Sequence, residues 1–252
     1  MSNSSLVDCV KISPNKTSPR NHKIDTISIH CAVGQFTAKE LVNLNHFTTY
    51  DAKRGSSCNY AIGRDGSIGL CVEEKDRSWC TSSRSNDNRA ITIEVASDKT
   101  HPYKVTDEAY KSLINLLVDI CKRNKIKELK WRADKSLIGN IAKQNMTVHR
   151  WFANKACPGD FLYDRHGQIA KEVNSRLQNQ TKTTYKPRLV KVVVNDLNIR
   201  KGPGTNYQKT GICTGKGVYT IVAESTGKGS KNGWGKLKSG VGWISLDYVK
   251  KI

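Results

Sequence analysis

The run Thr26-Ile27-Ser28-Ile29-His30-Cys31-Ala32 alternates apolar and polar residues and predicts a buried β-strand. His30 lies at the carboxyl end of this strand, where the sites of α/β sheets usually lie. A second run, Ala90–Ala96, is rich in β-branched residues and predicts another strand. It carries Glu94 in its middle, and a charge inside an apolar strand is costly unless it is paired or functional. A salt bridge and a catalytic role are both open for Glu94.

Hairpin and helix signals lie around these two strands. Apolar runs at 58–63 and 68–72 flank Asp65-Gly66, which predicts a β-hairpin with a tight turn. Thr37-Ala38-Lys39-Glu40 fits a capping box, and the spacing of the apolar residues that follow lets that helix run through Phe47. Thr106 caps a second expected helix, and a third starts near Pro158. Because strands and helices alternate, the region is predicted to be α/β.

A third stretch, Thr147–Asp160, brings together residue types that bind metals. His149 ends a short β-type run, Cys157 follows eight positions later, and Lys155 precedes that thiol by two. With His30, they supply two nitrogens and one sulfur, a ligand set that catalytic zinc sites use. Two other interpretations stay open on spacing alone: a hydrogen-bonded histidine beside a buried structural cysteine, and a Cys-His hydrolase that uses Cys157 and His149.

The chain has 252 residues, with 42 Lys+Arg against 22 Asp+Glu and a formal net charge of +20. Such a charge indicates an anionic partner, and nucleic acid, acidic membranes and anionic cell-wall polymers all have that chemistry. No apolar run is long enough to insert into a membrane. The first residues lack the basic and apolar regions of a signal peptide, so we expect synthesis in the cytosol. The eight cysteines are therefore expected to be free thiols, most of them in the core.

The composition changes near residue 178. Residues 179–188 are polar and aperiodic and predict a linker between a first domain, residues 1–178, and a second, residues 189–252. The second domain has short β-branched runs separated by glycine-rich turns, which is typical of an all-β fold. Both parts of the chain are basic.

Residues 24–177 resemble the zinc-dependent N-acetylmuramoyl-L-alanine amidases, a type shared with peptidoglycan recognition proteins and many phage endolysins. Five motifs occur in the order of that family: Ile27-Ser28-Ile29-His30, the hairpin Asn59–Gly66, Ile91-Thr92-Ile93-Glu94, Val148-His149 and Lys155-Ala156-Cys157-Pro158. The resemblance implies a mixed central sheet flanked by helices, and one Zn²⁺ bound by His30, His149 and Cys157.

The resemblance also implies roles in catalysis. Glu94 matches the strand glutamate that serves catalysis in related amidases, and Lys155 matches the lysine two residues before the last metal ligand. The short phage amidases carry a tyrosine in the hairpin, where this chain has Cys58 and Asn59. A tyrosine acid is therefore not expected. Cys80 lies near the position of a histidine in some relatives, and no role is assigned to it.

Residues 189–250 resemble a bacterial SH3 domain, a small β-barrel found beside cell-wall hydrolases. Three stretches carry this likeness: Leu197–Tyr207, Gly233–Leu237, and Gly242-Trp243-Ile244 with Tyr248. Trp234 and Trp243 could belong to the barrel core or to a ligand platform. The resemblance implies a domain that binds the cell wall.

Together, the two resemblances imply a peptidoglycan hydrolase that cleaves the amide between N-acetylmuramic acid and L-alanine. A phage or prophage endolysin that lyses Gram-positive cells is expected, made in the cytosol without a signal peptide and reaching the wall after release. The alternatives are a non-catalytic peptidoglycan-binding protein on the same fold and a bacterial autolysin. Expected partners are peptidoglycan and anionic wall polymers such as teichoic acid. Nucleic acid is not expected, because neither an RNA-binding signature nor a helix-turn-helix is visible.

Overall fold

A computed structural model describes residues 2–181 and 186–252 of the chain, which divides into two compact units, Met1–Gln178 and Asn179–Ile252. The first unit is built on a six-stranded sheet in the order β1-β5-β4-β7-β3-β8. Its strands are β1 (Cys9–Val10), β3 (Thr26–Cys31), β4 (Tyr60–Ile62), β5 (Ile68–Leu70), β7 (Ala90–Val95) and β8 (Met146–Thr147). The β4–β5 pair is antiparallel and every other pair is parallel, so the sheet is mixed.

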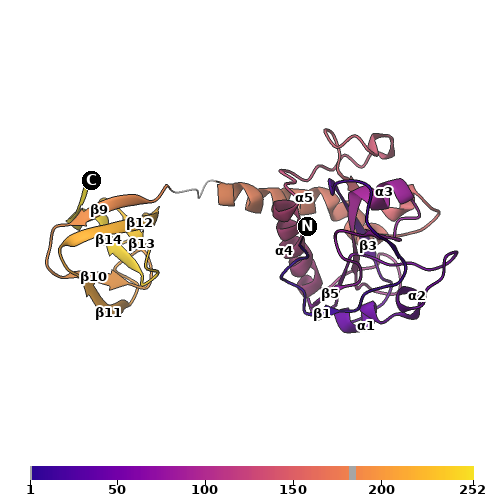
Figure 1. Cartoon of the computed structure of the whole chain (residues 1–252), viewed down its shortest axis with the longest axis horizontal. Coiled ribbons are helices and arrows are strands. Elements are labelled where there is room, and N and C mark those ends of the chain that lie inside the picture. The colour runs from indigo at the N-terminus through magenta and orange to yellow at the C-terminus, as the bar shows by residue number, and fades with distance from the viewer. Residues whose placement is uncertain (1, 182–185) are drawn as a thin grey trace. The chain divides into compact units, whose positions relative to one another are not determined.

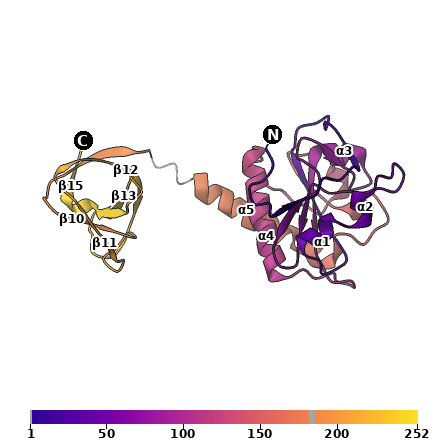
Figure 2. The same ribbon diagram turned by 60° about the horizontal axis from the view of Figure 1, so that its bottom comes forward.

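The helices of this unit lie on both sides of the sheet (Figures 1 and 2). They are α1 (Ala38–Val42), α2 (Asn45–Thr48), α3 (Arg84–Arg89), α4 (Asp107–Arg123) and α5 (Gly159–Thr181), with 3-10 turns η1 (Lys135–Leu137) and η2 (His149–Trp151). The long helices α4 and α5 pack on one side of the sheet and the short helices α1 to α3 lie toward the other (Figure 1). This arrangement confirms the predicted α/β class, with a mixed central sheet flanked by helices.

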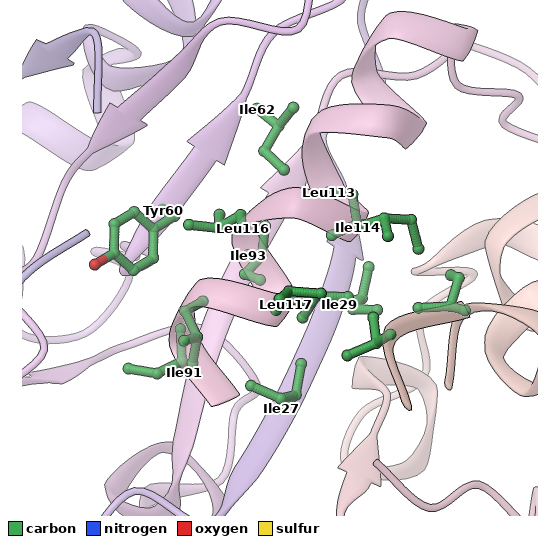
Figure 3. Packing of buried hydrophobic residues seen from close by; sticks show 14 of the residues in the cluster. Ile27, Ile29, Tyr60, Ile62, Ile91, Ile93, Leu113, Ile114, Leu116 and Leu117 are labelled. Carbon is green, nitrogen blue, oxygen red and sulfur yellow. The ribbon is translucent and has the colours of Figure 1, made fainter. Parts of the chain in front are cut away.

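Alternation along the central strands separates the two faces of the sheet. Ile27 and Ile29 of β3 and Ile91 and Ile93 of β7 point toward α4, where they are fully buried (Figure 3). The residues between them point the other way because successive side chains of a strand alternate. The face toward α4 is thus the main core, and the opposite face carries the polar residues of both strands.

The predicted hairpin is present as β4 and β5. Gly66 in its turn has φ +82°, and a Cβ there would lie 2.9 Å from the Ser112 hydroxyl, so glycine suits the position. The helix expected to run from Thr37 through Phe47 is instead two short helices, α1 and α2. Asn43 ends α1, and its side-chain amide donates to the Lys39 carbonyl before the backbone becomes extended at Leu44.

Elements that the sequence did not indicate lie in the polar segments. Residues 73–89 contain β6 (Arg77–Ser78) and α3, and residues 1–25 contain β1 and β2 (Lys16–Thr17). β2 and β6 form a separate antiparallel pair. These strands are only two residues long, so they leave no periodic signal.

The second unit is a seven-stranded sheet in the order β11-β10-β14-β13-β12-β9-β15, with every pair antiparallel. Its strands are β9 (Arg188–Val192), β10 (Leu197–Arg200), β11 (Lys209–Thr214), β12 (Gly217–Ser225), β13 (Trp234–Leu237), β14 (Trp243–Ser245) and β15 (Val249–Lys251), with the turn η3 (Leu246–Tyr248). Trp234 is buried, whereas Trp243 is half-buried. Of the predicted linker 179–188, residues 182–185 lie outside the described residues. Before that gap, α5 continues through Thr181.

Candidate functional site

The first two site residues are brought together by strand register. β3 and β7 are parallel neighbours in which His30 is the register partner of Glu94 and Ile29 that of Ile93. Because the isoleucines face the core, His30 and Glu94 both point to the opposite face, at the carboxyl ends of their strands. His30 Nδ1 lies 3.7 Å from Glu94 Oε1.

His149 and Cys157 reach the same place through the segment after β8. β8 pairs with β3 through Ser28 and Thr147, and the chain then turns in η2, which starts at His149. The Arg150 backbone N–H donates to the Cys157 carbonyl at 3.1 Å, and the Arg150 guanidinium donates to the Ala156 carbonyl at 2.6 Å. These bonds fold the segment back, so that the thiol returns to the imidazole eight positions before it.

One donor atom from each of His30, His149 and Cys157 lies within 4.8 Å of the other two. The Cys157 sulfur is 3.3 Å from His30 Nδ1. A tetrahedral zinc ion with bonds of about 2.0–2.3 Å needs nitrogen–sulfur separations of about 3.5 Å. Two imidazoles and a thiol at this spacing therefore fit a zinc ion.

A serine hydroxyl lies within hydrogen-bond distance of one ring nitrogen of each imidazole. Ser28 Oγ lies 3.1 Å from His30 Nε2, and Ser82 Oγ lies 3.1 Å from His149 Nε2. Burial lowers the pKa of His30 to about 3, and burial followed by the charge of Lys155 lowers the pKa of His149. Both rings are therefore neutral at pH 7, the state in which imidazole binds a metal.

Glu94 is a carboxylate in an apolar setting. Its side chain is 16% exposed, and the Cys80 thiol donates to Oε1 over 3.9 Å, while Oε2 has no hydrogen-bond partner among the described residues. Burial raises its pKa well above the ordinary value, as does the nearby Cys31 thiol. Within the described part of the chain, no lysine or arginine forms an ion pair with Glu94. A salt bridge with His30 would need a protonated imidazole, and burial lowers the pKa of His30 to about 3, so the salt-bridge interpretation of Glu94 is not supported among the described residues.

Lys155 is exposed and lines a cleft of about 710 Å³ together with His149. Its positive charge contributes, after burial, to the lowered pKa of the His149 imidazole. The structure thus brings all five predicted residues to one edge of the sheet: three as a group that could hold a metal, Glu94 beside them, and Lys155 in the wall of the cleft.

The hairpin residues divide between the two faces of β4. Tyr60 is buried in the core cluster with the isoleucines of β3 and β7 (Figure 3). Its hydroxyl donates to Glu74 Oε1 at 2.7 Å. Cys58 is buried on the site side, and burial raises the pKa of its thiol well above the ordinary value.

Four site neighbours carried no signal that the sequence analysis used: Ser28, Cys31, Cys80 and Ser82. Ser28 precedes His30 by two positions, so strand alternation alone would have put it on the same face. Cys80, with His30 and Glu94, forms a second group of donor atoms within 4.8 Å of one another. Cys31 forms a hydrogen bond with Cys157, and that bond, followed by burial, raises the pKa of the Cys157 thiol.

Solved structures with a similar fold include amidases and a recognition protein. A selenomethionine derivative of AmpD is 20% identical with a TM-score of 0.48, covering 66% of this chain and 96% of that one. A mutant endolysin from Bacillus subtilis is 15% identical with a TM-score of 0.47, and the alignment covers 67% of this chain and 99% of that one. The Drosophila peptidoglycan recognition protein SA is 14% identical with a TM-score of 0.47, and the alignment covers 63% of this chain and 90% of that one.

A search among curated proteins finds no match. The model of one protein family, described as N-acetylmuramoyl-L-alanine amidase, matches residues 20–160. This range is more than half of the chain and contains both imidazoles, the thiol, Glu94 and Lys155. The chain therefore belongs to the N-acetylmuramoyl-L-alanine amidase family.

Proposed function

We propose that this protein hydrolyses peptidoglycan at the amide that joins the lactyl group of N-acetylmuramic acid to L-alanine. The observation that carries the proposal is the convergence of His30, His149 and Cys157 beside Glu94, in a chain of the amidase family. Of these residues, His149 lines a cleft together with Lys155, and the polymer would enter there.

We propose that His30, His149 and Cys157 hold one Zn²⁺. The chain's own residues prepare this site, because Ser28 and Ser82 orient the two rings and burial keeps the imidazoles neutral. A bound zinc ion would supply Lewis acidity and make water nucleophilic near neutral pH. The residues around it then have to move protons and stabilise charge.

Glu94 is suited to move the proton. Burial raises the pKa of this carboxyl well above its ordinary value, and a raised pKa makes a carboxyl group a better proton acceptor than an ordinary one. Glu94 would accept a proton from the attacking water and deliver it to the nitrogen of the departing L-alanine. Its unpartnered Oε2 leaves one oxygen free for this exchange.

Lys155 is suited to stabilise charge. Attack on the amide carbon places negative charge on the carbonyl oxygen, and a fixed cation near that oxygen lowers the barrier. Lys155 lies in the wall of the cleft next to His149 and, among the described residues, forms no ion pair that would neutralise it. A Cys-His hydrolase built on Cys157 would leave His30 and Lys155 without roles.

The deciding experiment is digestion of purified Gram-positive walls, with mass analysis of the released muropeptides. We expect new N-terminal alanine, no new reducing sugar, and loss of both lysis and product after treatment with a chelator. Release of reducing sugar would identify a glycosidase instead. Wall binding without any product would identify the non-catalytic peptidoglycan-binding protein.

We further propose that residues 189–252 form a wall-binding domain of the bacterial SH3 type and that the whole chain acts as a phage or prophage endolysin. The antiparallel sheet of the second unit and its basic charge support a role in holding an anionic wall. Teichoic acid is one such polymer. Binding to walls before and after chemical removal of teichoic acid would test this ligand, since the proposal requires weaker binding afterwards.

A further inference from the structure

A second group of metal-binding atoms lies next to the first. The donor atoms of His30, Cys80 and Glu94 lie within 4.8 Å of one another, and the proposed function gives Cys80 no part. Glu94 Oε1 lies 3.7 Å from His30 Nδ1 and 3.9 Å from the Cys80 sulfur. Imidazole, thiolate and carboxylate are all ligands that zinc accepts. These three residues therefore offer a complete donor set that includes neither His149 nor Cys157.

The spacing within this second group is close to what a metal ion needs. Bonds of about 2.0–2.3 Å in a tetrahedral site give separations of about 3.3 Å between nitrogen and oxygen and about 3.5 Å between oxygen and sulfur. The two separations measured from Glu94 Oε1 exceed these values by only about 0.4 Å. The terminal torsion of a glutamate is broad, so the carboxylate can turn to close this difference.

Hydrogen bonds fix the backbone that carries Cys80. Its N–H donates to Asp87 Oδ2 at 3.1 Å, and the N–H of Thr81 donates to Asp87 Oδ1 at 3.1 Å. Asp87 belongs to α3 and is 2% exposed, so this attachment lies inside the unit. Cys80 is itself buried, and its thiol donates to Glu94. The thiol therefore faces the carboxylate before any metal ion arrives.

Glu94 lacks the partner that a buried carboxylate usually has. Its Oε2 is buried and has no hydrogen-bond partner among the described residues, and the bond that Oε1 accepts from the Cys80 thiol is long. Buried charges are normally paired or coordinate a metal, because burial without a partner costs free energy. The unsatisfied carboxylate is thus a second observation, besides the clustering of donor atoms, that indicates a cation at this place.

The two groups share one nitrogen atom of His30. Nδ1 lies 3.3 Å from the Cys157 sulfur and 3.7 Å from Glu94 Oε1, whereas Nε2 lies 3.1 Å from the Ser28 hydroxyl. A neutral imidazole has a single nitrogen lone pair with which to bind a metal. One ion at a time can use it, so occupation of one position excludes occupation of the other through His30.

We propose that His30, Cys80 and Glu94 form an alternative binding position for a thiophilic divalent cation such as Zn²⁺. An ion held there makes Glu94 a ligand, so the carboxylate cannot accept a proton from water. The protein then retains its ion in a resting state. The inference goes beyond the proposed function, because it concerns where the ion is bound, and hydrolysis is not needed to test it.

The test uses Co²⁺ as the probe and the full chain with Cys157→Ser. A thiolate bound to Co²⁺ gives an intense near-ultraviolet charge-transfer band, which nitrogen and oxygen ligands do not give. Since Cys157→Ser removes the thiolate of the first position, a band in this variant has to come from another cysteine. We expect one Co²⁺ per chain, with the band present.

A second substitution in the Cys157→Ser chain identifies the ligands. Adding Cys80→Ser should abolish the band and weaken Co²⁺ binding at least about tenfold, since loss of a direct ligand costs no less than loss of an outer partner. Adding Glu94→Gln should weaken binding by a similar factor and keep the band. Cys71→Ser is the matched control, because Cys71 is a buried thiol of the same apolar cluster that is not in the donor group. It should change neither the band nor the affinity.

A folded Cys157→Ser chain that binds no Co²⁺, or binds it without the band, would overturn the proposal. A band that survives Cys80→Ser or disappears with Cys71→Ser would also overturn it, and an affinity unchanged by Glu94→Gln would remove the carboxylate from the site. Circular dichroism of each variant shows whether the fold is intact. If the metal results are as expected but the wild-type protein cleaves no muropeptide, the proposed function alone is disproved.

Discussion

The carboxylate of Glu94 has one oxygen 3.7 Å from His30 Nδ1 and another without a hydrogen-bond partner among the described residues. Glu94→Gln keeps the shape of the side chain and removes its ability to take a proton. We expect turnover to fall about 10²- to 10⁴-fold, the usual contribution of general acid–base catalysis, with zinc content unchanged. Parallel measurement of muropeptide release and bound zinc tests this. Full activity in the variant would rule out the proton-transfer role.

Cys157 has a different expected signature, because its sulfur is a proposed ligand. Loss of a residue that only hydrogen-bonds to a metal ligand typically weakens metal binding about 10- to 100-fold. Cys157→Ser removes a proposed ligand itself, so zinc binding should weaken by more than that, and hydrolysis should be lost as well. Zinc titration monitored by calorimetry gives the affinity directly. Cys213→Ser is the matched control, since that thiol is exposed on the second unit. Stoichiometric zinc with normal affinity in Cys157→Ser would contradict the ligand assignment.

His166 links burial to the pH dependence of stability. It is fully buried on α5, where its Nδ1 lies 2.7 Å from the Leu162 carbonyl and burial lowers its pKa to about 4. The unfolded imidazole takes up a proton near pH 6.5, so between pH 6.5 and 4 the unfolded state binds more protons than the folded state. Stability from this group is complete above pH 6.5 and is lost as the pH falls.

By pH 5, His166 alone should lower the free energy of unfolding by about 2 kcal/mol relative to pH 7. Urea denaturation of the zinc-free protein at both values measures the total loss, to which His30 also contributes. In His166→Gln the loss between pH 7 and 5 should be smaller by about 2 kcal/mol. An identical loss in wild type and variant would show that His166 does not titrate in this window.

Among the elements, the segment before β3 depends on Arg20 for its attachment. This arginine is 6% exposed, and its guanidinium donates to the backbone carbonyls of Glu74, Asp76, Asp87, Asn88 and Ala90. Arg20→Met would leave several buried carbonyls without donors, so we expect a loss of about 3 kcal/mol or more of unfolding free energy. Urea denaturation measures the loss. Arg176→Met, which breaks an exposed bond to Asn115, should cost under about 0.5 kcal/mol. Equal losses would contradict the role of Arg20.

The elements also show how far the sequence can predict this fold. β3 and β7 were predictable because their apolar residues alternate over six positions, and the same alternation puts His30 and Glu94 on one face. β6 and α3 could not be predicted in this way, because a two-residue strand and a polar six-residue helix depend on hydrogen bonds to residues far away in the sequence. Arg77 lies in that segment. Its burial follows from pairing with β2, sixty residues earlier, which no local pattern reports.

The sequence also predicts the site only in part. The types and spacing of His149, Lys155 and Cys157 indicated a metal site, but the return of Cys157 toward His149 depends on the hydrogen bonds of Arg150. Ser82, which contacts the His149 ring, lies in a turn with no recognisable motif. Ligand types could thus be predicted from the sequence, whereas the groups that orient them required the structure.

At the scale of the whole molecule, the two units have separate cores. Buried apolar residues form one cluster around α4 and the central sheet, and another within β9 to β14 together with the η3 turn. Residues 179–252 carry 14 lysines and arginines against 3 acidic residues. A unit with its own core can be removed without opening the other. Charge of this size can contribute to wall attraction by itself, and such attraction weakens as salt rises.

Deleting residues 189–252 should therefore weaken binding to whole walls at least about tenfold, an effect expected when a second binding module is lost. Cleavage of a soluble muropeptide should stay within about twofold of wild type, since both imidazoles, the thiol and Glu94 belong to the first unit. Co-sedimentation with walls and product analysis give the two quantities. The double variant Lys250→Glu, Lys251→Glu reverses charge on β15 and reports how much binding is electrostatic. Equal loss of wall binding and soluble cleavage on deletion would instead indicate that the second unit supports the structure of the first.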